Sequence, residues 1–399
     1  MLTTPASHRR CQRLHSSLTT KDIMTNPTSS PRVVVIGGGV LGVSTATHLA
    51  RAGASVTLLT ESSISSGASG RSLSWLNSAG ERSPEYHALR MAGIDRYRTL
   101  GQKLGDSRFL RFDGGLTWAS PGESYAGRYQ HERSIGYDSI WLRPDEIERW
   151  TPGVDAASVN PEGAIFNPGE GWVDLPSLIE HLLTEFRAAG GAVHDNVGRV
   201  TVETANGRAT GARTAAGDVH DADAVVLATG PWVPGALEEL GVRVVDQTPI
   251  SLLLTTRAVE TDLRAVLNTP RVAVRPTPNG TLVLDSGWSE EEVVDLGNGS
   301  YQVNDDTIAG LLAEASAVLA GHPSLELDRY GVGPKPIPGD GEPVAGQVEE
   351  IPGLHVLFTH SGATLGLILG ELVAQEIVSG TPSPLLRTFR LSRFSVPAP

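Results

Sequence analysis

Cysteine is almost absent from this sequence, which contains a single one, Cys11, among 399 residues. One cysteine cannot form a disulfide, a cysteine-rich metal site or an iron–sulfur cluster within a chain. The 11 histidines do not show the H-x-x-x-H spacing of a zinc-binding helix. We therefore expect no bound metal and a reducing, cytoplasmic compartment.

Long apolar runs are scarce as well. No formally charged residue occurs from Val33 to Ala50, a length close to the minimum for a membrane span. Three consecutive glycines, 37–39, and several polar residues interrupt this run, so a strand, a turn and a helix explain it better. The sequence therefore predicts no integral membrane span.

Basic residues are fewer than acidic ones: the sequence has 32 Lys and Arg and 45 Asp and Glu, which gives a formal net charge of −13. An acidic protein is repelled by nucleic acids and anionic membranes, so we expect neither as a partner. The hydrophobic share of 40% and the charged share of 19% are typical of a globular protein. The length predicts two domains.

Residues 1–31 lack apolar periodicity, and we expect them to form a disordered tail. Their richness in Ser, Thr and Arg, with no acidic residue before Asp22, is typical of a transit peptide. A translation start at Met24 explains the same composition and is the interpretation we favour. The fold prediction is the same in both cases.

The ordered part begins with a strand, a helix and a second strand, predicted over 32–36, 40–52 and 55–60. Between the first strand and the helix stands Gly37-x-Gly39-x-x-Gly42, a dinucleotide-binding pattern in its proper context. The glycines allow a tight turn, close approach of a pyrophosphate and close helix–strand packing. Glu61, after the second strand, suits ribose hydroxyls and disfavours NADP. This pattern leaves NAD and FAD open.

The rest of the chain mixes helical and strand patterns. Apolar periodicity predicts helices over 84–104, 144–150, 175–189, 304–320 and 364–378. Strands are predicted over 109–119, 222–228 and 355–359, in a hairpin of 196–204 with 208–214, and as antiparallel strands within 249–285. We therefore predict an α/β fold in which a Rossmann-type domain is interleaved with an antiparallel-sheet domain.

Five further segments together carry a family resemblance. They are Ser66–Ser72, Ala228–Trp232, Val274–Gly280, Gly331–Pro343 and His360–Gly366. In this order they resemble the FAD-dependent amine and D-amino-acid oxidase superfamily, which includes glycine and sarcosine oxidases and D-amino-acid dehydrogenases. The resemblance implies an FAD-binding domain of residues 32–80, 166–235 and 336–399, and a substrate domain of residues 81–165 and 236–335.

The resemblance also implies which residues contact FAD. In the family, the loop at Ser66–Ser72 wraps the pyrophosphate and the flavin ring, and the last helix points its N-terminus at the flavin. A helix N-terminus stabilises the negative charge of the reduced ring. The implied contacts are Gly37, Gly39, Val40, Leu41, Gly42, Glu61, Ser69, Gly70, Arg71, Ser72, Val197, Thr229, Gly230, Trp232, Gly362, Ala363, Thr364 and Leu365.

The sequence departs from the family at three places that bear on flavin attachment, substrate binding and the electron acceptor. The histidine or cysteine that links flavin covalently in some members has no counterpart here, so we expect non-covalent FAD. Gly333 stands where D-amino-acid oxidases have the arginine that grips the substrate carboxylate. Asp285-Ser-Gly-Trp288 stands where sarcosine oxidases have the lysine that activates oxygen. The electron acceptor, oxygen or another carrier, therefore stays open.

Three side chains are candidates for the chemistry. Arg275 is predicted to bind a substrate carboxylate, with Lys335 as its substitute, and His360 to tune the proton of the amine. Structural alternatives are a salt-bridged strand arginine, a solvated loop lysine and a histidine that caps a strand end. Trp75 and Asn77 are further candidates to line the pocket.

These patterns predict an FAD-dependent oxidoreductase that oxidises the C–N bond of a small amine or amino acid by hydride transfer to flavin. Its substrate is expected to be of the D-amino-acid, glycine or N-methyl amino-acid type. Two alternatives are a non-catalytic flavin-binding subunit of a hetero-oligomeric dehydrogenase and an NAD-dependent dehydrogenase.

Overall fold

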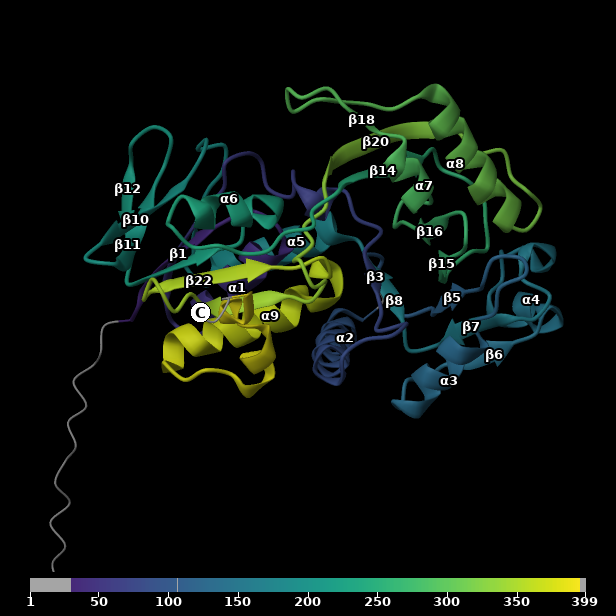
Figure 1. Ribbon diagram of the computed structural model, residues 1–399, viewed down its shortest axis with the longest axis horizontal. Helices are drawn as coiled ribbons and strands as arrows, with labels where there is room; N and C mark the ends of the chain where they lie inside the picture. Colours follow the sequence, from purple (N-terminus) through teal and green to yellow (C-terminus); the bar gives the residue numbers. More distant parts are fainter. Residues whose placement is uncertain (1–29, 106, 395–399) are drawn as a thin grey trace, which may run out of the picture. The chain divides into compact units, whose positions relative to one another are not determined.

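The computed structural model describes residues 30–105 and 107–394, and the described residues from Pro31 onward form one compact unit. The predicted tail, residues 1–31, lies almost entirely outside the described residues. Figure 1 shows the helices and strands of the described part.

A six-stranded sheet forms the first half of this unit. Its strand order is β21-β22-β13-β1-β2-β9. Strand β21 is antiparallel to β22, and all other neighbouring strands are parallel to each other. The strands are β1 (Arg32–Ile36), β2 (Ser55–Leu59), β9 (Ala192–His194), β13 (Ala224–Leu227), β21 (Val344–Gln347) and β22 (Leu354–Phe358). The runs of Val, Ile and Leu in β1, β13 and β22 suit strands that are buried on both faces.

Alternation along β1 sends side chains to two different layers. Val33 and Val35 pack among three helices, α1 (Val40–Arg51), α5 (Leu175–Ala188) and α9 (Gly362–Ser379). Val34 and Ile36 pack on the other face, against α6 (Val233–Glu238) and the three-stranded sheet of β10 (Thr201–Ala205), β11 (Arg208–Arg213) and β12 (Val219–Asp221). Figure 1 shows α6 and α9 on opposite sides of β22. The predicted Rossmann-type arrangement is confirmed.

An eight-stranded sheet forms the second half, in the order β20-β14-β17-β16-β15-β5-β7-β6. All neighbours are antiparallel except β15 and β5. The strands are β5 (Gly115–Thr117), β6 (Ile140–Leu142), β7 (Ala164–Asn167), β14 (Ile250–Thr256), β15 (Val266–Asn268), β16 (Ala273–Pro276), β17 (Leu282–Asp285) and β20 (Leu327–Pro334). The antiparallel strands predicted within 249–285 are therefore confirmed.

Helices cover this second sheet. Leu311 and Ala315 of α8 (Asp305–Val318) are buried in the same apolar cluster as Leu254 of β14 and Leu284 of β17. The remaining short elements of this half are α3 (Ala126–Ser134), α4 (Ile147–Trp150), α7 (Gly287–Glu291) and the ribbon of β18 (Val294–Asp295) with β19 (Tyr301–Gln302).

The chain passes between the halves through a small sheet of β3 (Trp75–Leu76), β8 (Gly171–Val173) and β4 (Leu110–Arg111). Next to it, α2 (Pro84–Leu104) packs against α9, and Tyr86, Leu89 and Tyr97 of α2 are buried in the cluster that contains α1 and α9. The predicted boundaries assign α2 to the substrate domain, whereas its packing joins it to the first half. The boundaries themselves stay a prediction.

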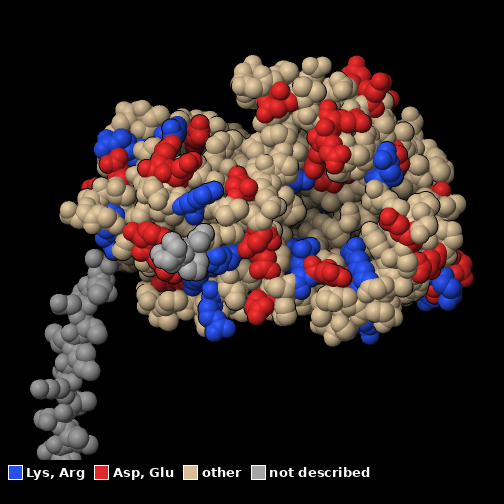
Figure 2. Space-filling view, in the orientation of Figure 1, with Lys and Arg blue, Asp and Glu red and all other residues tan. Residues whose placement is uncertain are grey.

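Among the described residues, one helix, α9, is long and apolar enough to cross a membrane. However, 61% of it is buried inside the protein, as in the core helix of a globular domain. The run from Val33 to Ala50 forms β1, a glycine turn and most of α1. On the face in Figure 2, acidic and basic side chains are interspersed.

Candidate cofactor and substrate site

A cavity of about 980 Å³ lies between the two halves of the unit. It begins at the turn between β1 and α1, passes the loop of residues 66–75, and reaches the ends of β14 and β17 and the start of α9. Its volume is at the upper end of the range for ligand pockets, so it has room for a dinucleotide-sized cofactor.

Glycine shapes the nucleotide end of the cavity. Gly37 has φ +126°, and a Cβ atom there would lie 2.3 Å from the carbonyl oxygen of Ala228. A Cβ atom on Gly42 would lie 2.0 Å from the carbonyl oxygen of Gly37. Only glycine allows this left-handed turn and this close helix–strand approach.

The loop Ser66–Ser72 folds over the N-terminus of α1. The amide of Val40 donates a 3.0 Å hydrogen bond to the Ser69 hydroxyl, and Arg71 donates to the carbonyl of Ser66 at 2.8 Å. The first amides of a helix lack intrahelical partners and attract anions. The loop and the helix N-terminus therefore form a site suited to phosphates.

The middle of the cavity fits the ribityl and flavin part of FAD. The Thr229 hydroxyl and the Arg71 Nε atom are both buried and have no hydrogen-bond partner among the described residues. Both residues line the cavity, as do Glu61, Gly230 and Trp232. Buried polar groups without partners indicate that a polar ligand satisfies them, which agrees with FAD in this cavity.

Helix α9 begins at the wall of the cavity, where Gly362, Ala363 and Thr364 line it. The Thr364 hydroxyl donates to the carbonyl of Trp75 at 3.2 Å and accepts from the amide of Asn77 at 3.3 Å. Trp75 and Asn77 also line the cavity. The helix N-terminus therefore directs its positive partial charge into the site.

Four predicted cofactor residues do not line the cavity. Gly42, Gly70 and Leu365 lie behind its wall, and Val197 uses its amide to bind the carbonyl of Thr60. Arg199 and Val200, slightly further along the chain, line the cavity instead. Gly42 and Gly70 still shape the wall, because a Cβ atom on either would lie within 2.4 Å of a backbone oxygen.

The opposite end of the cavity is charged. Lys335, just after β20, places Nζ 2.6 and 2.7 Å from the carboxylate oxygens of Glu290. Asp285, at the end of β17, also lines this end. Burial raises the pKa of Asp285 to about 6, although Lys335 opposes the shift. Lys335, which the sequence offers as a substitute for Arg275 in binding a substrate carboxylate, is therefore held in an ion pair and is not a solvated loop lysine.

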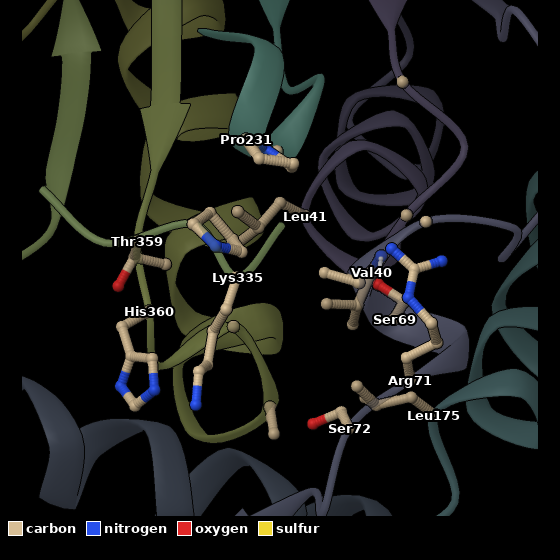
Figure 3. Close-up of a pocket in the computed structure, with 18 of the residues that line it drawn as sticks. Val40, Leu41, Ser69, Arg71, Ser72, Leu175, Pro231, Lys335, Thr359 and His360 are labelled. Atoms are coloured by element: carbon tan, nitrogen blue, oxygen red, sulfur yellow. Dashed lines mark hydrogen bonds between the residues drawn. The ribbon is translucent and has the colours of Figure 1, made fainter. Parts of the chain in front are cut away.

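His360 faces this charged end. Its side chain is exposed to the cavity, but the surrounding protein disfavours the charged ring and lowers its pKa to about 4; Lys335, Arg90 and Arg82 add to the effect. Figure 3 shows His360 and Lys335 extending into the cavity opposite Ser69 and Arg71. At neutral pH the imidazole is therefore uncharged, and its unprotonated nitrogen can accept a hydrogen bond.

Arg275 requires a correction. It is 3% exposed and does not line the cavity. Its guanidinium lies 5.4 Å from the centre of the Trp172 ring and 3.9 Å from Asp174. Ala273, two residues earlier on the same face of β16, does line the cavity. Trp172 and Asp174 thus cover Arg275, and the geometry does not favour its predicted contact with a substrate carboxylate.

Two arginines that sequence reasoning missed line the cavity instead, Arg82 and Arg90. Arg90 is 2% exposed and donates to the carbonyl oxygen of Asn77 at 2.8 Å, to the Asn77 side chain at 2.9 Å and to Tyr86 at 3.1 Å. It also donates to Ser361, just before α9. The only signal in the sequence is an arginine at an apolar position of a predicted helix.

A buried acid supports Trp75 from behind. Glu170 accepts a 2.8 Å hydrogen bond from the Trp75 indole and a 2.5 Å hydrogen bond from Tyr137. Burial raises the pKa of Glu170 to about 8. Trp75 is thereby fixed where the two halves meet.

The fold and this cavity define a flavoprotein of the Rossmann type. Among the described residues, no group of three or more His, Cys, Asp or Glu is placed to hold a metal. The chain belongs to the DAO family of FAD dependent oxidoreductases, whose model matches residues 32–376. The predicted family and its cofactor, FAD, are confirmed.

Curated relatives cover most of the chain at low identity. It is 27% identical to 4-methylaminobutanoate oxidase (formaldehyde-forming) of Paenarthrobacter nicotinovorans, over 91% of this chain but only 46% of that protein. It is 24% identical to glycine oxidase of Bacillus licheniformis, over 88% and 93% of the two chains. It is 25% identical to one subunit of the opine oxidase of Agrobacterium tumefaciens, over 91% and 97%.

The fold also matches solved structures. Glycine oxidase from Geobacillus kaustophilus superposes with a TM-score of 0.78, at 22% identity, over 92% of this chain and 100% of that chain. The predicted fold class, with its FAD-binding domain and antiparallel sheet, is confirmed.

Proposed function

We propose that this protein oxidises the C–N bond of a small amine or amino acid by hydride transfer to non-covalently bound FAD. The observation that carries the proposal is the continuity of one cavity. It joins the glycine turn after β1 to the start of α9 and to the charged end at Asp285, Lys335 and His360.

The chain offers a contact for each part of the cofactor. The α1 N-terminus and the Ser66–Ser72 loop bind the pyrophosphate, and Glu61 binds a ribose. The buried Thr229 hydroxyl, which has no partner among the described residues, forms a hydrogen bond with the ribityl chain or the flavin ring. When bound, FAD accepts a hydride from the carbon next to the substrate nitrogen. The loop 66–72 contains no histidine, and the single cysteine of the sequence, Cys11, stands near its beginning and not in the C-terminal third, which supports non-covalent binding.

The remaining residues prepare the substrate. A primary or secondary amine must lose its proton before the C–H bond can give up a hydride. The surrounding protein lowers the pKa of His360 to about 4, so the imidazole is a weak base. Its role is to accept a hydrogen bond from the neutral amine and orient it, while the proton of the ammonium form passes to solvent. Asp285 and Glu290 can attract the ammonium form. Two relatives are named as oxidases of 4-methylaminobutanoate and of glycine, which supports an amino acid as the substrate. A cytoplasmic location and the choice of acceptor stay predictions.

Anaerobic flavin bleaching tests this proposal. Purified protein is mixed without oxygen with N-methyl, D- and cyclic amino acids and with simple amines, and the visible flavin absorbance is followed. We expect at least one compound to bleach the flavin, and readmission of oxygen then separates an oxidase from a dehydrogenase. Protein that contains FAD but is bleached by dithionite and by none of the amines contradicts the proposal.

That negative outcome would favour a second candidate, a flavin-binding subunit of a hetero-oligomeric dehydrogenase. The similarity to the opine oxidase protein, which is named as one subunit of its enzyme, is the observation that favours it. The NAD-dependent alternative is set aside, because the family is FAD dependent.

A further inference from the structure

Arg82 occupies a rigid position on the cavity wall, in the turn that precedes α2. Before it, the amide of Gly80 donates to Glu132 at 2.8 Å. After it, the Ser83 hydroxyl caps α2 by accepting from the amide of Tyr86 at 3.2 Å, and donates to Glu342 at 2.5 Å. The backbone on both sides of Arg82 is therefore fixed.

The guanidinium of Arg82 lacks a counter-charge. Among the residues that the structure describes, none forms a hydrogen bond or ion pair with it, and its Nε atom is buried without a partner. It lies against the ring of Tyr86, whose centre is 5.5 Å away. Burial and the neighbouring charges of Arg90 and Arg128 lower the pKa of Arg82 to about 10. The Arg82 side chain is half-buried, and a partly desolvated cation without a partner favours an anion beside it.

The other cations of the cavity are already engaged. Lys335 is paired with Glu290, and Arg90 binds Asn77, Tyr86 and Ser361. Arg71 donates to Ser66 and lies against β20, where Cβ atoms on Gly331 and Gly333 would lie 2.7 and 2.4 Å from it. Arg71 therefore fills the space that an arginine side chain at position 333 would need.

We propose that Arg82 binds a carboxylate group of the substrate, so that the substrates are amino acids rather than simple amines. Arg82 and His360 line the same cavity, and the charge of Arg82 adds to the lowering of the His360 pKa. A guanidinium binds a carboxylate through two parallel hydrogen bonds. This inference rests on the proposed function and names its substrate class.

The first test is binding without turnover. Propionate and its neutral isostere propionamide are titrated into the FAD-loaded protein, and the flavin difference spectrum is recorded for wild type, Arg82→Gln, Arg82→Lys and Arg149→Gln. Arg149 is exposed and does not line the cavity, so its variant matches the loss of charge alone. We expect propionate to bind about tenfold or more weakly to Arg82→Gln, because one charge-assisted pair is lost.

The expected pattern has three other parts. Arg82→Lys keeps part of the affinity, Arg149→Gln binds propionate as wild type does, and propionamide binds weakly to every variant. Equal binding of propionate to wild type and Arg82→Gln overturns the inference, and so does wild-type protein that binds propionate no better than propionamide.

Thermal unfolding in the absence of ligand separates a binding role from a structural one. Removing a half-buried, unpaired charge relieves part of its desolvation cost, so we expect Arg82→Gln to be as stable as wild type or more stable. A marked loss of stability identifies Arg82 as a structural residue and overturns the inference.

The two proposals can fail separately. If amino acids and their neutral amides bleach the flavin equally well in wild type, the oxidoreductase function stands and the role of Arg82 falls. If propionate binds through Arg82 but no amine bleaches the flavin, the anion site stands and the catalytic function falls.

Discussion

The two ends of the cavity are built in different ways. At the nucleotide end, backbone amides and glycines within one strand–turn–helix unit make the site, and the side chains matter mainly by their absence. At the charged end, Arg82, Asp285, Lys335 and His360 converge from four segments that are far apart in the sequence. A local pattern therefore determines the first end, and the tertiary fold determines the second.

The largest effect is expected from a substitution that adds a side chain to a glycine at the nucleotide end of the cavity. In Gly37→Ala the new Cβ atom meets the carbonyl of Ala228 at 2.3 Å, in a backbone conformation with φ +126°. We expect loss of most bound FAD and a lower unfolding temperature, measured by the ratio of flavin to protein absorbance and by calorimetry.

Gly127→Ala is the matched control for this change. Gly127 lies in α3 with no atom within 4 Å of its added Cβ and no positive φ. Alanine is favoured over glycine in a helix by about 1 kcal/mol, so this variant should be equally or more stable. A Gly37→Ala protein that retains full FAD would remove the steric argument for the turn.

The same contrast explains how much the sequence alone could predict. The glycine turn, the Asn206-Gly207 hairpin and the amphipathic helix α5 each depend on residues close in the chain, and all three were predicted. Asn206 and Gly207 both have positive φ, as such a hairpin turn requires. The family resemblance was needed to predict FAD, because the glycine pattern is the same for FAD and for NAD.

The charged end was predicted only in part, since Lys335 and His360 were candidates and line the cavity, whereas Arg82 was missed. Whether an arginine faces a cavity depends on what packs against it, and Trp172 covers Arg275 whereas nothing neutralises Arg82 among the described residues. Both are arginines in unremarkable local sequence. The distinction arises from contacts across the fold, so a prediction from residue type chose Arg275 and overlooked Arg82.

An intermediate effect on catalysis is expected when the ion pair between Lys335 and Glu290 is removed at the charged end. In Lys335→Met, Glu290 and Asp285 lose their nearby cation. We expect kcat/KM to fall about tenfold, the cost of one charge-assisted interaction, while FAD content stays unchanged. Steady-state kinetics on the best substrate of the bleaching panel, with flavin absorbance as the check, measures this.

The loss of stability in Lys335→Met depends on pH in a predictable direction. Without Lys335 the pKa of Glu290 rises further above its ordinary range, so the stability penalty of the variant is largest at high pH. The penalty shrinks as the pH falls and Glu290 takes up a proton. Lys103→Met, at an exposed site on α2, is the control. Loss of FAD in Lys335→Met, with Lys103→Met intact, would show that the two ends are not separable.

The smallest effect is expected at Glu170, which holds Trp75 where the two ends meet. Because the pKa of Glu170 is raised from 4.5 to about 8, the folded protein binds this proton more tightly than the unfolded chain does. Its contribution to stability is therefore complete at low pH. It declines by up to about 1.4 kcal/mol per pH unit as the pH rises from the ordinary pKa through the folded one.

Glu170→Gln imitates the protonated acid at every pH. Its amide oxygen can still accept from Trp75 and its amide group can donate to Tyr137, so at about pH 5 we expect a change of stability within about 1 kcal/mol, and an unchanged KM. As the pH rises from there, the variant should become progressively more stable than wild type, since it has no proton to lose. Urea unfolding between about pH 5 and pH 9 measures how the free energy of unfolding of each protein changes with pH, and the difference between the two slopes reports the proton of Glu170. Parallel slopes for the two proteins would mean that Glu170 is ionised in the folded state, and that Trp75 is held by a buried carboxylate rather than by a neutral acid.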